Sequence, residues 1–312
     1  MTAWNLGAPL SALLLSAFYS VAVGVPPVPP IEPPHGLPTK GKAVKPSGQT
    51  NSTGNGIEYH GGPVLNNRNG PTLYFIWYGD WSGNSATQIL PDFAYHIGGS
   101  PYFNINTTYY DYDKESEKEF VLNRVSFKGS IDDPYSLGGS LSDNDVQTVV
   151  ANAIESRRLP ADPNGVYLVL TSADVMQQEF CVNFCAWHWS TTNGGFPLIA
   201  GVDIKFGHVG NSDQCPAACQ WQNPSPNNSP AAYDMASAIA HELEESVTDP
   251  DDNAWINSDR SENADLCAWT FGREMILPDG ATYNMKLGRR LYHIQRNWVN
   301  ARGGYCALSW DE

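Results

Sequence analysis

The sequence predicts a mixed α/β or α+β fold, in which helices pack on a mixed sheet and one helix resembles the active-site helix of zincins. Three observations support this fold class. Short apolar runs rich in β-branched and aromatic residues alternate with segments of helical periodicity. Residues 57–312 are long enough to form one well-buried domain. Six cysteines, all after residue 180, predict a C-terminal part that is stapled by disulfides.

Residues 1–24 have the pattern of a secretory signal peptide. Their apolar run, residues 10–24, is too short to be a comfortable membrane span. It ends in the small residues Ala22-Val23-Gly24, which a signal peptidase accepts. The alternative is an uncleaved anchor, but no stop-transfer pattern follows. We therefore expect a secreted protein that begins near Val25 and has no membrane contact after cleavage.

Residues 25–56 are expected to be a linker. A proline-rich stretch favours extended polyproline conformation, and the Gly/Ser/Thr/Asn run that ends at Gly56 cannot bury a core. One glycosylation sequon begins at Asn51, and two more begin at Asn106 and Asn227. In a secreted chain these three asparagines are plausible surface sites for glycans.

Four elements are expected before the first cysteine. They are a strand at Thr72–Tyr78, a helix at Ser85–His96, a helix from Ser142 to about Arg157, and a strand at Val166–Thr171. The third begins with a capping box formed by Ser142 and Asp145. The fourth is short and continuously apolar, which is typical of a strand that is buried on both faces.

The second half of the chain alternates in the same way. Strands are expected at Ala186–Thr192 and Leu198–Phe206, and a closing hairpin at Tyr283–Val299. Between them, residues 229–250 form an amphipathic helix in which Ser229 is the N-cap. Its proline at the first helical position is favourable, and the Asp-Pro step at residues 249–250 ends it.

The most informative motif is His-Glu-Leu-Glu-Glu at residues 241–245, near the end of this helix. His241 and Glu245 are one turn apart, so both side chains can ligate one metal ion. Glu242 then projects toward the open position of the ion, where the general base for a bound water belongs. This is the metalloprotease pattern H-E-x-x-H with glutamate in place of the second histidine. The simpler alternative is an exposed acidic helix face on which His241 makes an ordinary hydrogen bond.

A third ligand is expected shortly after the helix. Glu262 and Asp265 are both candidates, and zinc is the expected ion. His188 is a further candidate from a predicted strand, but a hydrogen-bonded core histidine is the better interpretation of it. The other histidines that we considered carry no spacing signal and are taken as structural: His60, His96, His208 and His293.

Several ordered motifs resemble the EXORDIUM or phosphate-induced protein 1 family. They include the pentapeptide 241–245, Thr-Asp-Pro at 248–250 and Ala-Asp-Leu-Cys at 264–267, together with aromatic blocks at 59–65 and 74–81. The resemblance extends from about residue 57 to the C-terminus. It implies secretion to the cell wall or apoplast and a link to growth control, and it supplies no established reaction.

The six cysteines fit an oxidising compartment. They lie in three pairs along the sequence, Cys181/Cys185, Cys215/Cys219 and Cys267/Cys306. Six cysteines allow fifteen pairings, and the sequence does not choose among them. We expect Cys267–Cys306 as a long bridge, with local or crossed bridges among the other four. Zinc binding by these thiols is disfavoured, because secreted proteins normally oxidise them.

The net charge of −15 argues against nucleic acids and anionic membranes as partners. Two functions remain. The first is a secreted zinc-dependent hydrolase, peptidase-like, that acts on an extracellular peptide or a cell-wall component. The second is a non-enzymatic cell-wall or signalling protein involved in growth regulation, with a structural metal site or none. A structural site is closed by protein ligands, whereas a catalytic site keeps a water-accessible position.

Overall fold

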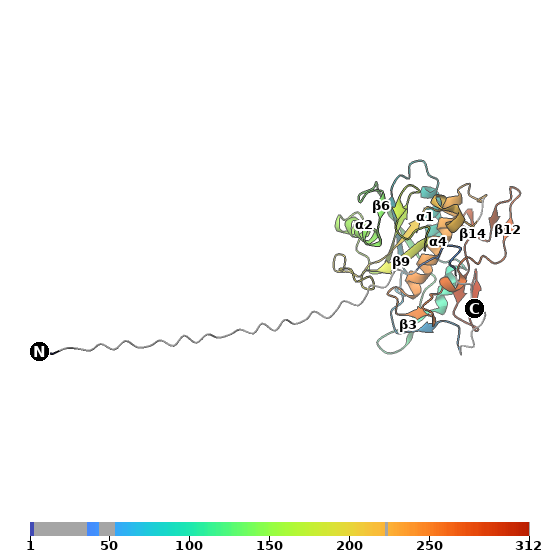
Figure 1. The fold of residues 1–312 in the computed structure, drawn as a ribbon. Coiled ribbons are helices and arrows are strands. Elements are labelled where there is room, and N and C mark those ends of the chain that lie inside the picture. The colour runs from blue at the N-terminus through green and yellow to red at the C-terminus, as the bar shows by residue number, and fades with distance from the viewer. Residues whose placement is uncertain (3–35, 44–53, 222–223, 312) are drawn as a thin grey trace. The chain divides into compact units, whose positions relative to one another are not determined.

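The computed structural model describes residues 1–2, 36–43, 54–221 and 224–311 (Figure 1). The expected signal peptide, apart from its first two residues, most of the linker and Asn51 lie outside these ranges. The chain divides into two units, Met1–Pro30 and Ile31–Glu312, and the second contains everything described below.

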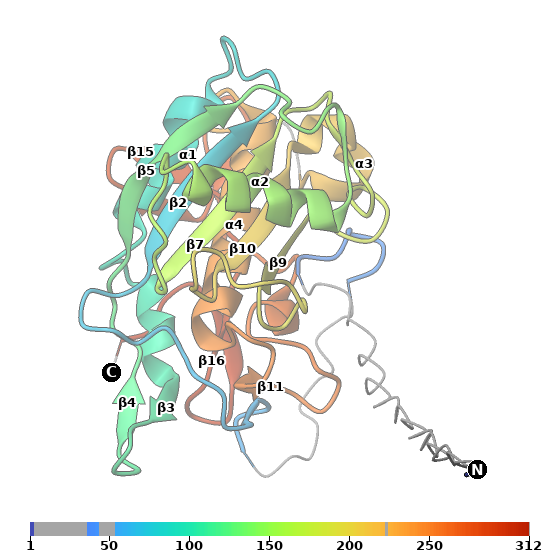
Figure 2. The ribbon, with the colours of Figure 1, turned by 90° about the vertical axis from the view of Figure 1, so that its left-hand side faces the viewer.

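A five-stranded mixed sheet forms the centre of this unit (Figure 2). Four strands run parallel, and the edge strand β9 runs antiparallel to its neighbour β10. In spatial order the strands are β5 (Ser126–Asp133), β2 (Thr72–Tyr78), β7 (Gly165–Thr171), β10 (Lys205–Gly210) and β9 (Ala186–Ser190). Every residue of β7 is buried, as the continuous apolar run predicts.

Helices cover both faces of the sheet. Figure 2 shows α2 in front of the strands and α4 behind them. Apolar residues alternate along each strand, so that one set packs with α2 and the other with α1 and α4. The helices are α1 (Ala86–His96), α2 (Asp143–Glu155), α3 (Pro216–Cys219) and α4 (Pro230–Thr248), with 3₁₀ turns η1 (Phe103–Thr108), η2 (Ser212–Gln214) and η3 (Asp265–Cys267).

Short two-stranded pairs surround this centre. They are β1 (Glu58–Tyr59) with β11 (Trp255–Ile256), β3 (Tyr110–Tyr112) with β4 (Lys118–Phe120), β6 (Ser140–Leu141) with β8 (Met176–Gln177), β12 (Met275–Ile276) with β13 (Thr282–Tyr283), β14 (Met285–Leu287) with β15 (Arg290–Tyr292), and β16 (Asn297–Val299) with β17 (Tyr305–Ala307).

Three expectations need correction. The strand expected at Leu198–Phe206 begins only at Lys205, because residues 199–202 close a turn through mutual backbone hydrogen bonds. The closing hairpin is shorter than Tyr283–Val299, since β14 and β15 form it and β16 pairs with β17. Ser229 occupies the N-cap position of α4, but its side chain makes no capping hydrogen bond there. The capping box of Ser142 and Asp145 on α2 is confirmed.

Three disulfides staple the C-terminal part. Cys267 pairs with Cys306 as expected, and the other four cysteines form crossed bridges, Cys181–Cys215 and Cys185–Cys219. The two crossed bridges tie the start of β9 to the segment before α4. They therefore fix the position of the edge strand relative to that helix.

Two glycosylation expectations fall within the described residues. Asn106 is fully buried in η1, so the folded chain offers no room for a glycan there. This corrects the expectation of a surface site. Asn227 is partly exposed, and its amide nitrogen donates to the carbonyl oxygen of Leu291 at 2.8 Å.

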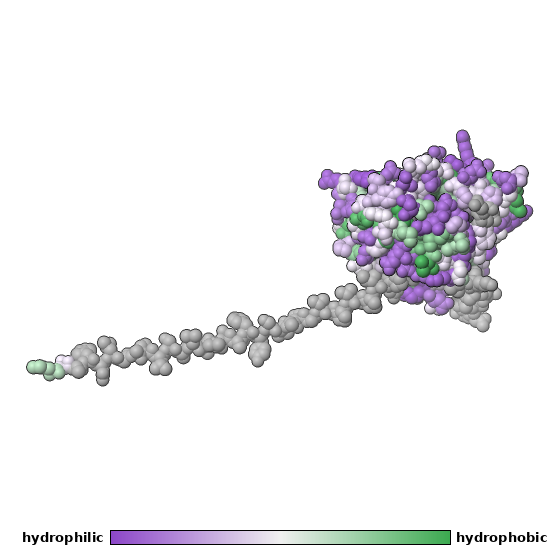
Figure 3. Space-filling view, turned by 45° about the horizontal axis from the view of Figure 1, so that its top comes forward, coloured by the Kyte–Doolittle hydropathy of each residue, from purple (hydrophilic) through white to green (hydrophobic). Residues whose placement is uncertain are grey.

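Figure 3 shows one face, on which polar residues surround separate apolar patches. None of the helices in the described ranges combines the length and the apolar character that crossing a membrane requires.

Candidate metal centre

Helix α4 buries an unusual number of charged side chains. Its last two turns place His241, Glu242, Glu244 and Glu245 at 0% exposure. Apolar neighbours at four-residue spacing, such as Ile239 and Leu243, pack the same turns into the core. Buried carboxylates are costly unless a positive charge or hydrogen-bond donors compensate them. The groups that compensate these carboxylates therefore indicate which kind of ligand the cluster can bind.

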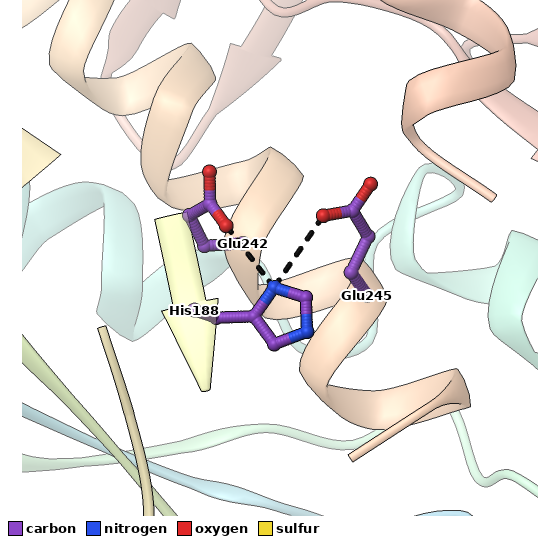
Figure 4. A group of neighbouring side chains, drawn as sticks. All are labelled: His188, Glu242 and Glu245. Atoms are coloured by element: carbon purple, nitrogen blue, oxygen red, sulfur yellow. Dashed lines mark hydrogen bonds and ion pairs between the residues drawn. The ribbon is translucent and has the colours of Figure 1, made fainter. Parts of the chain in front are cut away.

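His188 brings one imidazole to the cluster from β9. Strand alternation sends Trp187 and Trp189 to the α2 side and His188 to the α4 side. Its Nδ1 lies 3.2 Å from Oε2 of Glu242 and 3.5 Å from Oε2 of Glu245. Figure 4 shows the ring between the two carboxylates, with one nitrogen facing both.

His241 forms a second group around the same glutamate. Its Nε2 lies 3.0 Å from Oε1 of Glu245 and 3.5 Å from Oδ1 of Asp265. On the opposite edge of the ring, Nδ1 contacts the side-chain amide of Gln295 at 2.8 Å. That amide also donates to the carbonyl oxygen of Ala264, which fixes the ring orientation. Glu245 thus joins both groups, one through each carboxylate oxygen.

Glu262 and Glu244 have different surroundings. Glu262 is almost fully buried, and its Oε1 lies 3.6 Å from Nε2 of His188. Glu244 accepts a hydrogen bond of 2.7 Å from the amide of Asn297. Glu244 belongs to neither group that could hold a metal ion, and Glu262 approaches the first group only through His188.

The charges of this cluster are strongly coupled. Burial by itself lowers the pKa of His188 and His241, but the surrounding carboxylates, chiefly Glu262 and Glu245 respectively, raise both well above the usual value. Burial also acts to raise the pKa of Glu245, yet the charge of His241 and the contacts with both imidazoles hold it at about 2. Burial raises the pKa of Glu262 well above its usual range. The cluster contains more carboxyl groups than imidazoles, so a bound cation could replace the protons of the imidazoles as the compensating charge.

The atom spacing suits a metal ion. In a tetrahedral zinc site with bonds of about 2.0–2.1 Å, neighbouring ligand atoms lie about 3.3 Å apart. The imidazole–carboxylate separations in the two groups range from 3.0 to 3.5 Å. Within the described residues, His241 Nε2, Glu245 Oε2 and both oxygens of Glu262 make no hydrogen bond although they are buried. Such atoms are expected where an ion completes their coordination.

The position of Glu242 differs from that of an open catalytic base. Its Oε1 accepts a hydrogen bond of 3.0 Å from the backbone nitrogen of Leu37, and its Oε2 faces His188. Leu37, which provides this nitrogen, is 3% exposed, and the Glu242 side chain is 0% exposed. Glu242 therefore has no contact with solvent in this arrangement.

The structure brings together most of the residues that the sequence singles out. His241, Glu245 and Asp265 form one potential ligand group, and Glu262 lies beside His188 of the other. Sequence reasoning kept His188 as a further candidate but preferred to interpret it as a hydrogen-bonded core histidine. The alternation of Trp187, His188 and Trp189 was the available signal, since it turns one polar side chain away from two apolar ones. No sequence signal marked Leu37 or Gln295.

Comparison with known proteins agrees with the sequence motifs. The conserved region of phosphate-induced protein 1 matches residues 57–286. EXORDIUM-like 3 of Arabidopsis thaliana is 34% identical over 80% of this chain and 82% of its own length. EXORDIUM-like 5 of the same plant is 31% identical over 78% of this chain and 75% of its own length. PHOSPHATE-INDUCED 1 of Nicotiana tabacum is 26% identical over 70% of this chain and 73% of its own length. No solved structure matches the chain.

Proposed function

The chain belongs to the phosphate-induced protein 1 family, to which the EXORDIUM-like proteins are related, and on this premise we propose an extracellular, growth-related protein with a structural zinc site. The three disulfides support an oxidising, extracellular location. Growth regulation at the cell wall follows from the family resemblance. In this proposal the arrangement described here has no enzymatic activity.

One observation carries the structural role of the site. Every side chain of the cluster except Asp265 is at least nine-tenths buried, and the backbone nitrogen of Leu37 donates to Glu242. A catalytic zinc site keeps a position that water and substrate can reach, whereas a structural site is closed by the protein. The closed cluster therefore favours stabilisation of the fold over hydrolysis.

Of the two groups, the one around His241 is the better candidate for the ion. Glu242 in the other group already accepts a backbone hydrogen bond and faces His188. The Nε2 of His241 makes no hydrogen bond within the described residues. The proposed ligands are His241, Glu245 and Asp265, with Glu262, whose buried oxygens make no hydrogen bond within the described residues, as the fourth ligand that a closed site requires. His188 compensates charge beside them.

Metal analysis of the purified protein and thermal unfolding with zinc or a chelator test this proposal. A ligand that binds only the folded state stabilises it by about 4 kcal/mol at a thousandfold excess over its Kd. We expect one bound divalent ion and a lower Tm after its removal. His241→Gln should abolish the zinc response, whereas His60→Gln, at an exposed histidine, should keep it. A protein that purifies without metal and gains no stability from zinc contradicts the site.

A metal-dependent hydrolase is the second candidate, and the partial exposure of the Asp265 side chain, 19%, favours it because the proposed ion group is then reachable by water. In that case Glu242 would act as the general base that takes a proton from a water bound to the ion. Glu242→Gln should then keep metal and fold while hydrolysis of library peptides falls about a hundredfold or more. Absence of cleavage by metal-loaded wild-type protein rejects this candidate.

A further inference from the structure

We propose that the groove between the start of β9 and helix α4 is a binding site for an extended peptide, and that residues 36–43 occupy it within the same chain. The ligand class is an extended backbone with glycine, an apolar residue and proline in succession. This inference goes beyond the proposed metal site, because it depends on backbone pairing and not on an ion.

The first step is the hydrogen bonding of the segment. Its backbone pairs antiparallel with the residues that lead into β9. The backbone nitrogen of Cys185 donates to the carbonyl oxygen of Leu37 at 2.8 Å. The backbone nitrogen of Thr39 donates to the carbonyl oxygen of Asn183 at 3.0 Å. Peptide ligands that extend the edge of a sheet bind in this way, since the bonds come from the main chain of both partners.

The second step is the fit of Gly36. A Cβ atom at this residue would lie 2.3 Å from the Cα of Trp187 and 2.5 Å from the carbonyl oxygen of Ala186. Both are backbone atoms of β9 and have little freedom to move. The groove therefore selects glycine at this position, in the way that a binding pocket selects a side chain.

The third step concerns the next two residues. Leu37 inserts into the main apolar core and is 3% exposed, while its nitrogen donates to Glu242. The carbonyl oxygen of Pro38 accepts a hydrogen bond of 2.7 Å from the indole nitrogen of Trp269. Beyond them, the Lys40 ammonium contacts the carbonyl oxygen of Gln220. Each of the residues from Gly36 to Lys40 thus has its own contact on the groove.

Residues 36–43 and the groove that they occupy lie in different parts of the sequence. The groove residues Cys185, Trp187, Glu242 and Trp269 lie inside the matched family region 57–286, whereas the segment precedes it. The region that defines the family therefore contains the groove and not its occupant. A peptide of similar chemistry from a second protein can make the same contacts once residues 36–43 have left.

A trans-binding experiment on the full chain tests this site. Gly36→Ala should displace the segment, because the added methyl group meets the backbone of β9. Gly41→Ala is the matched control, since no atom lies within 4 Å of a Cβ there. The probe is a fluorescent synthetic peptide with the sequence of residues 36–43, measured by anisotropy in zinc and in chelator.

We expect saturable binding to the Gly36→Ala chain and at least tenfold weaker binding to the wild-type and Gly41→Ala chains. The same peptide with alanine in place of its glycine should bind at least tenfold more weakly. Equal affinity in zinc and chelator is expected, so that failure of the metal site leaves this result unchanged. Equal binding of both peptides, or none to the Gly36→Ala chain, overturns the proposal.

A second variant covers the case in which Gly36→Ala does not fold. Trp269→Phe keeps an aromatic ring but removes the donor to Pro38. Hydrogen exchange at the amide of Cys185 should accelerate at least tenfold in this variant, and excess peptide should reverse the acceleration. An exchange rate that neither the substitution nor the peptide changes contradicts the peptide site.

Discussion

The two faces of the central sheet bury different kinds of side chain. On the α2 face, apolar side chains such as Ile76, Val149 and Val169 fill the space, and His208 is buried beside them. On the α4 face, a comparable apolar layer is interrupted by carboxylates and imidazoles at or near 0% exposure. Both faces belong to the same strands, and the charges of the α4 face come mainly from the helix itself, together with His188 of β9.

The two faces differ in how the burial of their side chains affects the free energy of unfolding. An apolar face gains free energy from each methylene group that it buries and needs no partner for it. A charged face loses free energy on burial unless the charges are paired or bind an ion. A protein keeps such a face when the cluster has a further role, and here that role is the proposed zinc site. The comparison can be tested by substitutions on each face.

The largest effect is expected for Glu245→Gln on the α4 face. Glu245 is the carboxylate that contacts both His188 and His241, so its loss leaves two buried imidazoles without their shared partner. Breaking a buried ion pair typically costs about 3–5 kcal/mol, and we expect a loss of this size in chemical denaturation. The response to zinc should disappear as well.

Glu155→Gln is the control for this variant. Glu155 is also a helical glutamate, but it is exposed on α2, and such surface changes usually stay within about 0.5 kcal/mol. If Glu245→Gln costs no more than Glu155→Gln, the charges of the α4 face are not a paired network and the comparison between the faces fails.

The next effect is pH-dependent and belongs to the α2 face. His208 is fully buried beside Thr171, and burial lowers its pKa from 6.5 to about 3. The folded protein therefore keeps the imidazole neutral, while the unfolded chain protonates it below about pH 6.5. This contribution to stability is complete above that pH and is lost as the pH falls toward 3. At pH 5 the loss is about 2 kcal/mol.

His208→Leu should remove this contribution. The unfolding free energies of wild type and variant are measured by denaturation at pH 7 and at pH 5. Between these pH values, the wild type should lose about 2 kcal/mol more than the variant. Other titrating groups cancel in this difference. A difference that does not change with pH means that His208 gains its proton at the same pH in the folded and the unfolded chain, so that the α2 face would contain a charge at pH 5.

The sequence predicts the framework of both faces better than it predicts the site. Apolar periodicity and the capping box place β2, α1, α2, β7 and α4 with small errors in their bounds. The strand expected at Leu198–Phe206 is misplaced, because its apolar residues form a turn that no local rule distinguishes from a strand.

Within the site, the sequence predicts what one helix can determine. The spacing of His241 and Glu245 follows from helical geometry, so their proximity can be derived without a structure. The approach of His188 and the hydrogen bond from Leu37 depend on tertiary contacts between segments 54 and 205 residues apart in the sequence. Such contacts leave no local pattern, and therefore the closed state of the cluster could not be predicted.

The smallest effect is expected for Ile76→Val, which removes one methylene group from the α2 face. Ile76 is fully buried on β2. Such a change typically costs about 0.5–1.5 kcal/mol, because the surrounding side chains close the space only in part. The cost should be equal in zinc and in chelator, since Ile76 belongs to the apolar cluster under α2. Combined with Glu245→Gln, the two losses should add within about 0.5 kcal/mol, because the residues share no partner. A larger coupling energy in the double variant would show that the strands transmit strain from one face to the other, and the two faces would then have to be treated as one cooperative core.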